Sequence, residues 1–171
     1  EEVPLDNPYW PYSRHKAACE EVLGDCSMNV TIVRPSHTYR TRFPSTVVDG
    51  NHLAWRLLNH KPVIVHDDGE SLWTLTHSDD FARAFVGLFG CEQALNAVCH
   101  ITSDEGFSWN DILTAVATSL DVSVDIRRVS SKKLIEHNAQ WQGPLLGDKS
   151  NSMVFDNQRI KQWVPGWECT M

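Results

Sequence analysis

The chain has 171 residues, of which 42% are hydrophobic, and its formal net charge is −7. This length and composition are typical of a folded domain with a sizeable core and exclude an intrinsically disordered chain. The surplus of acidic residues argues against non-specific nucleic-acid binding, and the absence of an 18-residue apolar run argues against a transmembrane helix.

The first half of the chain alternates helix and strand signals. In chain order, the pattern predicts a loop over residues 4–11, a helix over 12–26, a strand over 29–33, a helix over 45–59, a strand over 62–66, a turn over 67–70 and a strand over 71–76. The strand over 29–33 is β-branched and continuous, as expected for a buried parallel strand, and Arg34-Pro35 is predicted to end it.

The second half continues the alternation. Asp79 or Asp80 is expected to N-cap an apolar helix that runs to about Phe89, with Gly90 as its C-cap. The elements predicted after it are a strand over 97–102, a helix over 109–120 capped by Ser108, a strand over 122–127, short helices over 131–137 and 156–163, and one long flexible loop over 144–152. Strands that alternate with helices predict an α/β architecture.

The cysteine and histidine patterns carry little metal or disulfide signal. Five cysteines are scattered and never form C-x-x-C, which suits reduced thiols in a cytoplasmic protein. Eight histidines are also dispersed, and His52 and His60 share a predicted helix without nearby carboxylate or thiol partners. The sequence therefore predicts no metal site.

Tyr12 and Lys16 form a Tyr-x-x-x-Lys pattern at the start of a predicted helix. Their spacing places the phenol and the ammonium on one helical face. A free tyrosine has a pKa of about 10, and a nearby positive charge lowers it; bringing it near 7 takes roughly 4 kcal/mol and a sheltered site. The pair suits proton abstraction from an alcohol that loses hydride, while the simpler alternative is an amphipathic helix with a surface lysine.

Three further segments follow this pair in the chain. They are Val33-Arg34-Pro35-Ser36-His37-Thr38-Tyr39, Asp68-Gly69-Glu70 with Trp73-Thr74 and Asp79-Asp80-Phe81-Ala82-Arg83-Ala84, and Phe155-Asp156-Asn157-Gln158-Arg159-Ile160. With the Tyr-x-x-x-Lys pattern, their order and spacing resemble the C-terminal half of the NAD-dependent epimerase/dehydratase family of extended short-chain dehydrogenases/reductases. The resemblance covers nearly the whole chain.

This resemblance implies roles for five residues around a nicotinamide. Tyr12 would be the general acid/base, and Lys16 would both lower the pKa of the tyrosine and hydrogen-bond the nicotinamide ribose. Pro35, Ser36 and His37 would lie against the carboxamide, because α/β folds place ligands at strand ends. The implied cofactor is NAD or NADP.

Other residues have less specific expectations. Arg42 falls where the family often has an arginine for an anionic group such as a nucleotide-sugar phosphate, and a solvated loop arginine is the alternative. Arg40 stands where the family usually has glycine, so its side chain would alter the backbone or the substrate entrance. Trp55, Trp73 and Trp109 are expected in a core or an interface.

The family's Gly-x-x-Gly-x-x-Gly turn and its catalytic Ser or Thr are not found in this sequence. We therefore expect residues 1–171 to be the C-terminal part of a Rossmann-like doubly wound parallel sheet plus a small α/β substrate-binding subdomain. By analogy with the family, roughly 110 to 150 residues would precede it as a dinucleotide-binding half. Without that half, the chain should lack dinucleotide binding and turnover.

The expected function is that of an NAD(P)-dependent epimerase, dehydratase or reductase that acts on a small, nucleotide-sugar-like molecule. The full-length protein would be cytoplasmic and without a membrane span, and it would form a homodimer through helices that include the Tyr-x-x-x-Lys helix. One alternative is a non-catalytic dinucleotide-sensing or RNA-associated regulator, to which Phe155-Asp156-Asn157 bears a likeness. Another is a free-standing domain used for protein contacts.

Overall fold

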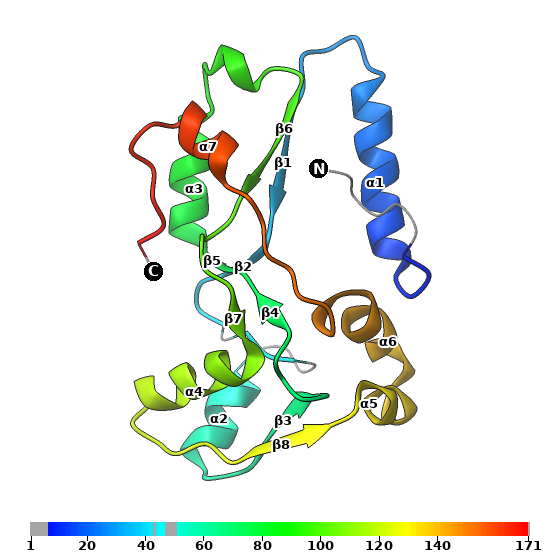
Figure 1. Ribbon diagram of the computed structural model, residues 1–171, viewed down its shortest axis with the longest axis vertical. Coiled ribbons are helices and arrows are strands. Elements are labelled where there is room, and N and C mark those ends of the chain that lie inside the picture. The colour runs from blue at the N-terminus through cyan, green and yellow to red at the C-terminus, as the bar shows by residue number, and fades with distance from the viewer. Residues whose placement is uncertain (1–6, 43, 47–50, 171) are drawn as a thin grey trace. The chain divides into compact units, whose positions relative to one another are not determined.

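The computed structural model describes residues 7–42, 44–46 and 51–170, and it divides into two compact units. Unit 1 lies within residues 1–38, 74–105 and 155–171, and unit 2 lies within 39–73 and 106–154. Each unit contains helices and one pair of parallel strands, so the predicted α/β class is confirmed (Figure 1).

Unit 1 is built around the parallel strands β1 (Thr31–Pro35) and β6 (Ala97–Ile101), which pair from Thr31↔Ala97 to Pro35↔Ile101. A second pair joins β2 (His37–Tyr39), at whose end the chain leaves this unit, to β5 (Leu75–His77). The helices of the unit are α1 (Pro11–Gly24), α3 (Ser78–Gly87), a 3₁₀ turn (Glu92–Ala94) and α7 (Gln158–Trp163).

The core of unit 1 lies where α3, α7 and β6 meet. Its buried members are Ala84, Cys99, Ile101, Ile160 and Trp167. The indole N–H of Trp167 donates to the backbone oxygen of Asp80 at 2.9 Å, so the C-terminal segment is fixed to α3. The strand β6 is therefore packed against two helices that come from separate segments of unit 1's sequence.

Unit 2 is built around the parallel strands β3 (Val63–His66) and β8 (Ile126–Val129), which pair from Val63↔Ile126 to His66↔Val129. Antiparallel β4 (Leu72–Trp73) pairs with β7 (Phe107–Ser108). The helical segments are α2 (His52–Leu58), α4 (Trp109–Ser119), α5 (Ser131–His137), a 3₁₀ turn (Ala139–Trp141), α6 (Gln142–Pro144) and a π-helical turn (Leu145–Lys149).

Local sequence explains the start of α4. Ser108 accepts from the backbone N–H of Asp111 at 3.1 Å, and the Asp111 carboxylate accepts from the backbone N–H of Ser108, which completes a capping box as predicted for Ser108. Gly69 supports α4 from the turn after β3. It has φ +76°, and a Cβ there would meet the side-chain oxygen of Asn110 at 2.7 Å, so other residues would be strained in this turn.

Several predicted boundaries shift because pairing partners decide them. The first strand begins at Thr31 and includes Arg34 and Pro35, since its last residue pairs with Ile101. The strand predicted over 71–76 is two strands, β4 and β5, with different partners. The strand predicted over 122–127 is β8, because the register with β3 begins at Ile126.

The predicted helices also need correction. The helix expected over 45–59 is α2, His52–Leu58; residues 45 and 46 are not helical, and residues 47–50 lie outside the described residues. The last helix begins at Gln158, two residues later than predicted. Residues 145–149 form a π-helical turn instead of a flexible loop, because Leu145 is fully buried and the backbone oxygen of Lys149 accepts from Ser71 at 2.6 Å.

The cap prediction at α3 is wrong. The N-cap is His77, whose Nδ1 accepts from the backbone N–H of Asp79 at 3.3 Å, and the helix ends at Gly87 with Leu88 as its C-cap. Gly90, with φ +81°, lies beyond that cap in the following turn. The tryptophans divide: Trp73 and Trp109 are buried as expected, whereas Trp55 is 53% exposed.

Candidate functional site

Helix α1 carries the Tyr-x-x-x-Lys pair. Pro11 occupies the first helical turn, where its fixed φ favours a helix start and its missing N–H costs nothing. One turn separates Tyr12 from Lys16, and the Lys16 ammonium lies 5.5 Å from the centre of the Tyr12 ring. The Trp10 ring also packs against the Tyr12 ring, with 4.9 Å between the ring centres. The structure therefore brings the phenol and the ammonium together as the spacing predicts.

The surroundings of this pair are open. Tyr12 is 53% exposed, and Ala17 is the one buried residue among the fourteen of α1. A proton acceptor that depends on a neighbouring charge needs a water-poor environment. The described part of the chain supplies the pair but leaves it largely exposed to solvent.

An ion pair connects α1 to β1. The Glu20 carboxylate accepts from Nε of Arg34 at 3.0 Å and from its Nη2 at 2.6 Å, and both side chains are partly buried. A bidentate contact of this kind fixes the orientation of the two side chains as well as the distance between them. Glu20 lies one turn after Lys16, and Arg34 directly precedes Pro35. The ion pair between Glu20 and Arg34 therefore sets the position of α1 relative to the end of β1.

A hydrogen-bonded chain lies at the carboxyl ends of β1 and β6. The Ser36 hydroxyl is 2.9 Å from the Thr76 hydroxyl, which in turn accepts from the backbone N–H of Ser103 at 2.9 Å. Thr76 is fully buried. Since the register pairs Pro35 with Ile101, Ser36 and Ser103 both lie near the edge where parallel sheets place ligands.

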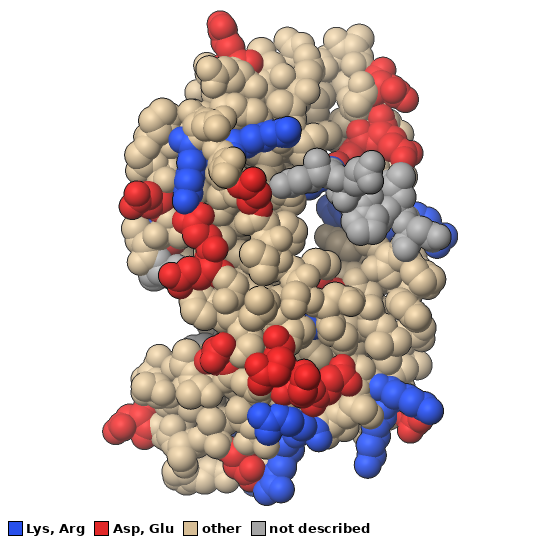
Figure 2. All heavy atoms as spheres, in the orientation of Figure 1, with Lys and Arg blue, Asp and Glu red and all other residues tan. Residues whose placement is uncertain are grey.

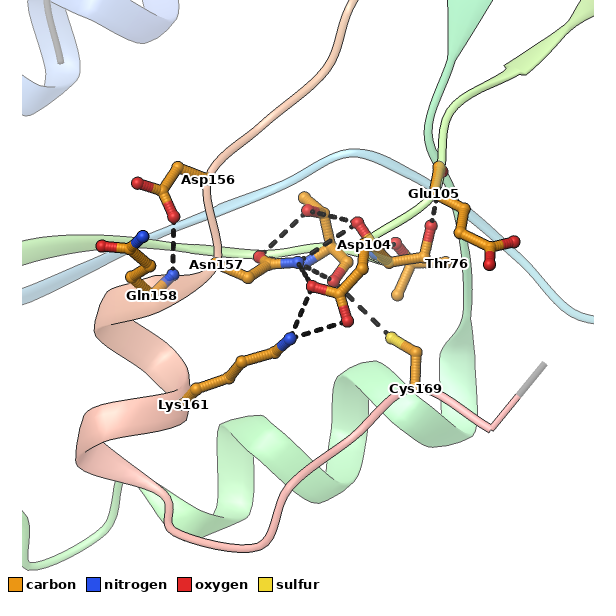
Figure 3. Close-up of polar contacts among 10 residues, drawn as sticks. Thr76, Asp104, Glu105, Asp156, Asn157, Gln158, Lys161 and Cys169 are labelled. Carbon is orange, nitrogen blue, oxygen red and sulfur yellow. Dashed lines mark hydrogen bonds and ion pairs between the residues drawn. The ribbon is translucent and has the colours of Figure 1, made fainter.

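Asn157 extends this arrangement from the start of α7 (Figure 3). Its side-chain oxygen accepts from the Thr102 backbone N–H at 3.2 Å, and its amide nitrogen donates to the Ser103 backbone oxygen at 3.1 Å. Lys161, one turn later, forms an ion pair with Asp104 at 2.7 Å. The hydrogen bonds of the Asn157 amide therefore hold the residues that follow β6, and they do not serve a ligand.

Sequence reasoning did not identify Thr76, Ser103 or Asn157 as supports of the strand ends. A local signal exists only for Asn157, in the Phe155-Asp156-Asn157 segment. Thr76 follows Ser36 by 40 residues, and its contacts depend on how β5 lies beside the ends of β1 and β6. Only the tertiary fold reveals these contacts.

The remaining predicted site residues have different surroundings. Pro35 is exposed at the end of β1, and His37 is half-buried at the start of β2. Arg42 is exposed in a bend of unit 2, and Arg40 is exposed two residues before it. Tyr12, Lys16, Pro35, Ser36 and His37 all belong to unit 1, whereas Arg42 belongs to unit 2.

Asp80 is an anchor and not the helix cap that was expected. Its buried carboxylate accepts from the Arg83 guanidinium, from the Thr170 backbone N–H at 3.1 Å and from the Thr170 hydroxyl at 2.9 Å. Burial alone would raise the pKa of this carboxyl, but the hydrogen bonds from Arg83 and Thr170 outweigh it and hold the pKa below its ordinary value. Asp80 thus joins α3 to the C-terminal segment.

Neither a metal centre nor a membrane-spanning helix is found in the described residues. Among the described residues, no three His, Cys, Asp or Glu side chains lie close enough together to hold a metal ion. None of the helices in the described part of the chain has both the length and the apolar character needed to cross a membrane.

Comparison with known proteins identifies the relatives of this fold. The model of the NAD dependent epimerase/dehydratase family matches residues 1–95, which is more than half of the chain. No curated protein sequence matches.

Among solved structures, the dTDP-glucose 4,6-dehydratase of Bacillus anthracis in complex with NAD is 18% identical, with a TM-score of 0.74, over 100% of this chain and 50% of that chain. DesIV, the dTDP-glucose 4,6-dehydratase of Streptomyces venezuelae with NAD bound, is 19% identical, with a TM-score of 0.73, over 100% and 49%. The UDP-glucose 4-epimerase of Thermotoga maritima with UDP-glucose is 21% identical, with a TM-score of 0.66, over 94% and 48%. The chain therefore spans about half the length of the solved structures it matches.

Proposed function

The chain belongs to the NAD dependent epimerase/dehydratase family, and we propose that it is the C-terminal catalytic and substrate-binding part of an NAD(P)-dependent enzyme of this kind. The reaction would begin with oxidation of an alcohol on a nucleotide-sugar-like substrate. The observation that supports this proposal most directly is the position of the Lys16 ammonium, 5.5 Å from the centre of the Tyr12 ring. Both residues lie on α1, which the Glu20–Arg34 ion pair joins to β1.

In the proposed step, Tyr12 accepts the proton of a substrate hydroxyl while the hydride on the same carbon leaves. The nicotinamide of NAD or NADP, when bound, accepts that hydride. The Lys16 ammonium stabilises the negative charge that develops on the phenol oxygen. A unit charge about 5 Å away contributes about 0.8 kcal/mol in water but about 3 kcal/mol at an effective dielectric constant of 20, so the step requires a sheltered site.

The strand end offers a fitting place for the nicotinamide carboxamide. Ser36 is held by Thr76, and Thr76 by the Ser103 backbone, so the hydroxyl at this edge is fixed before any ligand binds. The sequence contains no glycine-rich turn for the pyrophosphate. We propose that a dinucleotide-binding half, which would account for the other half of the related structures, supplies that turn and covers α1.

A nucleic-acid function finds less support. The net charge is −7, and on the face drawn in Figure 2 the Lys and Arg side chains form small groups with acidic and uncharged residues between the groups. RNA binding depends on a continuous basic surface. In addition, the Asn157 amide of the segment that suggested this alternative is occupied by backbone contacts of its own chain.

The test is a Tyr12→Phe substitution in the protein that joins this chain to its dinucleotide-binding half. With UDP-glucose and dTDP-glucose as trial substrates, we expect turnover to fall by about 10³-fold or more, because the proton acceptor is gone. Affinity for NAD, measured by calorimetry, should change by less than about two-fold. Tyr9→Phe, three residues earlier and 46% exposed, is the matched control and should keep full activity.

Full activity of the Tyr12→Phe enzyme would remove Tyr12 from the mechanism. Salt-dependent RNA binding with no turnover on any alcohol tried would favour the regulatory alternative instead.

A further inference from the structure

Unit 2 contains a cavity of about 490 Å³. This volume is within the range of pockets that hold small organic ligands. The wall is formed by side chains from α2, β3, α4, β8 and α5, so all the main elements of the unit contribute to it. Its apolar members are Leu53, Val63, Ile64, Leu113, Val129 and Leu134, with the Trp141 ring beside them.

The charged side chains in the described part of this cavity's wall are all basic. Arg56 and Lys133 line it together with His52 and His137, and no acidic residue is among the described residues that line it. The chain as a whole has 22 acidic and 15 Lys or Arg residues, so the surplus of basic residues in this wall is opposite to the surplus of acidic residues in the whole chain. The cavity beside α1 in unit 1 shows the opposite pattern, with Glu20 and Glu21 in its lining and no basic residue among the described residues that line it.

Parts of the wall are held in place without a ligand. Nε of Arg56 donates to the backbone oxygen of Pro62 at 2.6 Å, which fixes the guanidinium at the end of α2. The Thr46 hydroxyl donates to the backbone oxygen of Ile64 at 3.1 Å, and the His137 and Trp141 rings lie 6.0 Å apart, centre to centre. Preorganised walls reduce the entropy lost on binding.

We propose that this cavity binds an amphipathic anion, meaning an apolar chain or ring that carries one anionic group. The apolar wall covers the body of the ligand, and the surplus of positive charge from Arg56 and Lys133 favours the anionic end. A nucleotide is a poorer fit, since its base and ribose bring many polar atoms to a wall whose exposed surface is mostly apolar. The inference goes beyond the proposed function and does not depend on the chemistry of Tyr12.

Isothermal titration of the 171-residue chain with decanoate tests the proposal. Decyltrimethylammonium, with the same chain length and the opposite charge, is the first comparison, and UDP is the second. We expect decanoate to bind at least about ten-fold more tightly than either. The comparison is stringent, because a protein with net charge −7 attracts the cation more strongly at long range.

Lys133→Gln provides the residue-level test. Lys133 is exposed on α5 and lines the cavity, whereas its neighbour Lys132 is exposed and does not line it. Decanoate affinity should fall about five- to ten-fold in Lys133→Gln and remain unchanged in Lys132→Gln, with circular dichroism showing that both variants are folded.

Three results would overturn the proposal. The first is no heat of binding for decanoate, and the second is an equal loss of affinity in the two lysine variants. The third is tighter binding of UDP than of decanoate, which would make the cavity a nucleotide site. None of these results changes the expectation for Tyr12→Phe, so the two accounts fail separately.

Discussion

Helices α1 and α4 are similar in length but differ in how the chain uses them. Five of the eleven residues of α4 are buried, namely Trp109, Ile112, Leu113, Val116 and Ala117, and its first turn is closed by a capping box. Helix α1 has fourteen residues, one of them buried, and its N-cap residue makes no side-chain hydrogen bond. One helix is a core element of unit 2, and the other lies on unit 1 with most of its surface uncovered.

The difference indicates what each helix is for. Most helical stability in proteins comes from burying an apolar face, which α4 does within its own unit. Helix α1 leaves Tyr12, Val22 and Leu23 at least 39% exposed while it carries the candidate acid/base pair. An exposed apolar surface beside the candidate pair is what we expect if, as proposed above, a dinucleotide-binding half covers α1.

The largest expected effect is on the stability of α4. Trp109 is fully buried and packs against Trp73 at 5.1 Å, centre to centre. Trp109→Ala should lower the free energy of unfolding by about 3–5 kcal/mol through lost burial and a cavity. Val22 on α1 is 71% exposed, so Val22→Ala should change the free energy of unfolding by less than about 0.5 kcal/mol. Urea unfolding measures both, and equal losses would contradict the contrast between the helices.

The anchor at Asp80 comes next. Asp80→Asn removes the charge that accepts from Arg83 and Thr170, and we expect a loss of about 2 kcal/mol at pH 7. Because the folded pKa is below the unfolded value of 3.8, this stability is present above pH 3.8 and is lost as the pH falls through the folded pKa. Thermal unfolding from pH 7 down to pH 2.5 should therefore show a smaller acid loss in Asp80→Asn than in the wild type.

His66 makes unit 2 sensitive to mild acid. Its ring is buried; Nε2 is 2.9 Å from the backbone oxygen of Lys149 and so carries the proton, while Nδ1 is buried without a partner among the described residues. Burial lowers the pKa of His66 below 6.5, although the Lys149 carbonyl and Asp67 oppose that shift. Below pH 6.5 the unfolded chain takes up a proton that the folded chain does not, so stability falls as the pH drops from 6.5 to the folded pKa.

Thermal unfolding between pH 5 and pH 8 checks this expectation with His66→Gln. The variant keeps an N–H donor and removes the titration, so its stability should depend less on pH below 6.5. His15→Gln, at an exposed position of α1, is the control and should keep the wild-type dependence. Unchanged pH dependence in His66→Gln would show that another group causes the acid sensitivity.

The smallest effect concerns the ion pair that holds α1. Glu20→Gln weakens the contact with Arg34 and should cost about 1 kcal/mol, since the pair is only partly buried. Glu21→Gln, at the exposed neighbouring position, should cost nothing measurable. Equal stabilities of the two variants in urea unfolding would mean that Glu20 does not hold the helix.

The sequence predicts features that depend on near neighbours. The Tyr12–Lys16 contact, the Ser108 cap and the helix over 131–137 all rest on spacings of a few residues, and the structure has them where they were expected. The His77 cap was missed because Asp79 and Asp80 have the stronger capping propensity, and the Asp80 carboxylate is taken by Thr170, 90 residues away. The hydrogen bond between Ser36 and Thr76 was also missed, because sequence patterns carry no information on contacts between distant segments.

Amide hydrogen exchange of α1 and α4 tests the central proposal, that α1 carries the catalytic pair and is covered by a dinucleotide-binding half. In the 171-residue chain, the amides of α1 should exchange at least about ten-fold faster than those of α4. In the protein that includes the dinucleotide-binding half, exchange in α1 should slow by about ten-fold or more while α4 stays the same. Protection of α1 equal to that of α4 in the 171-residue chain, unchanged in the longer protein, would contradict the claim.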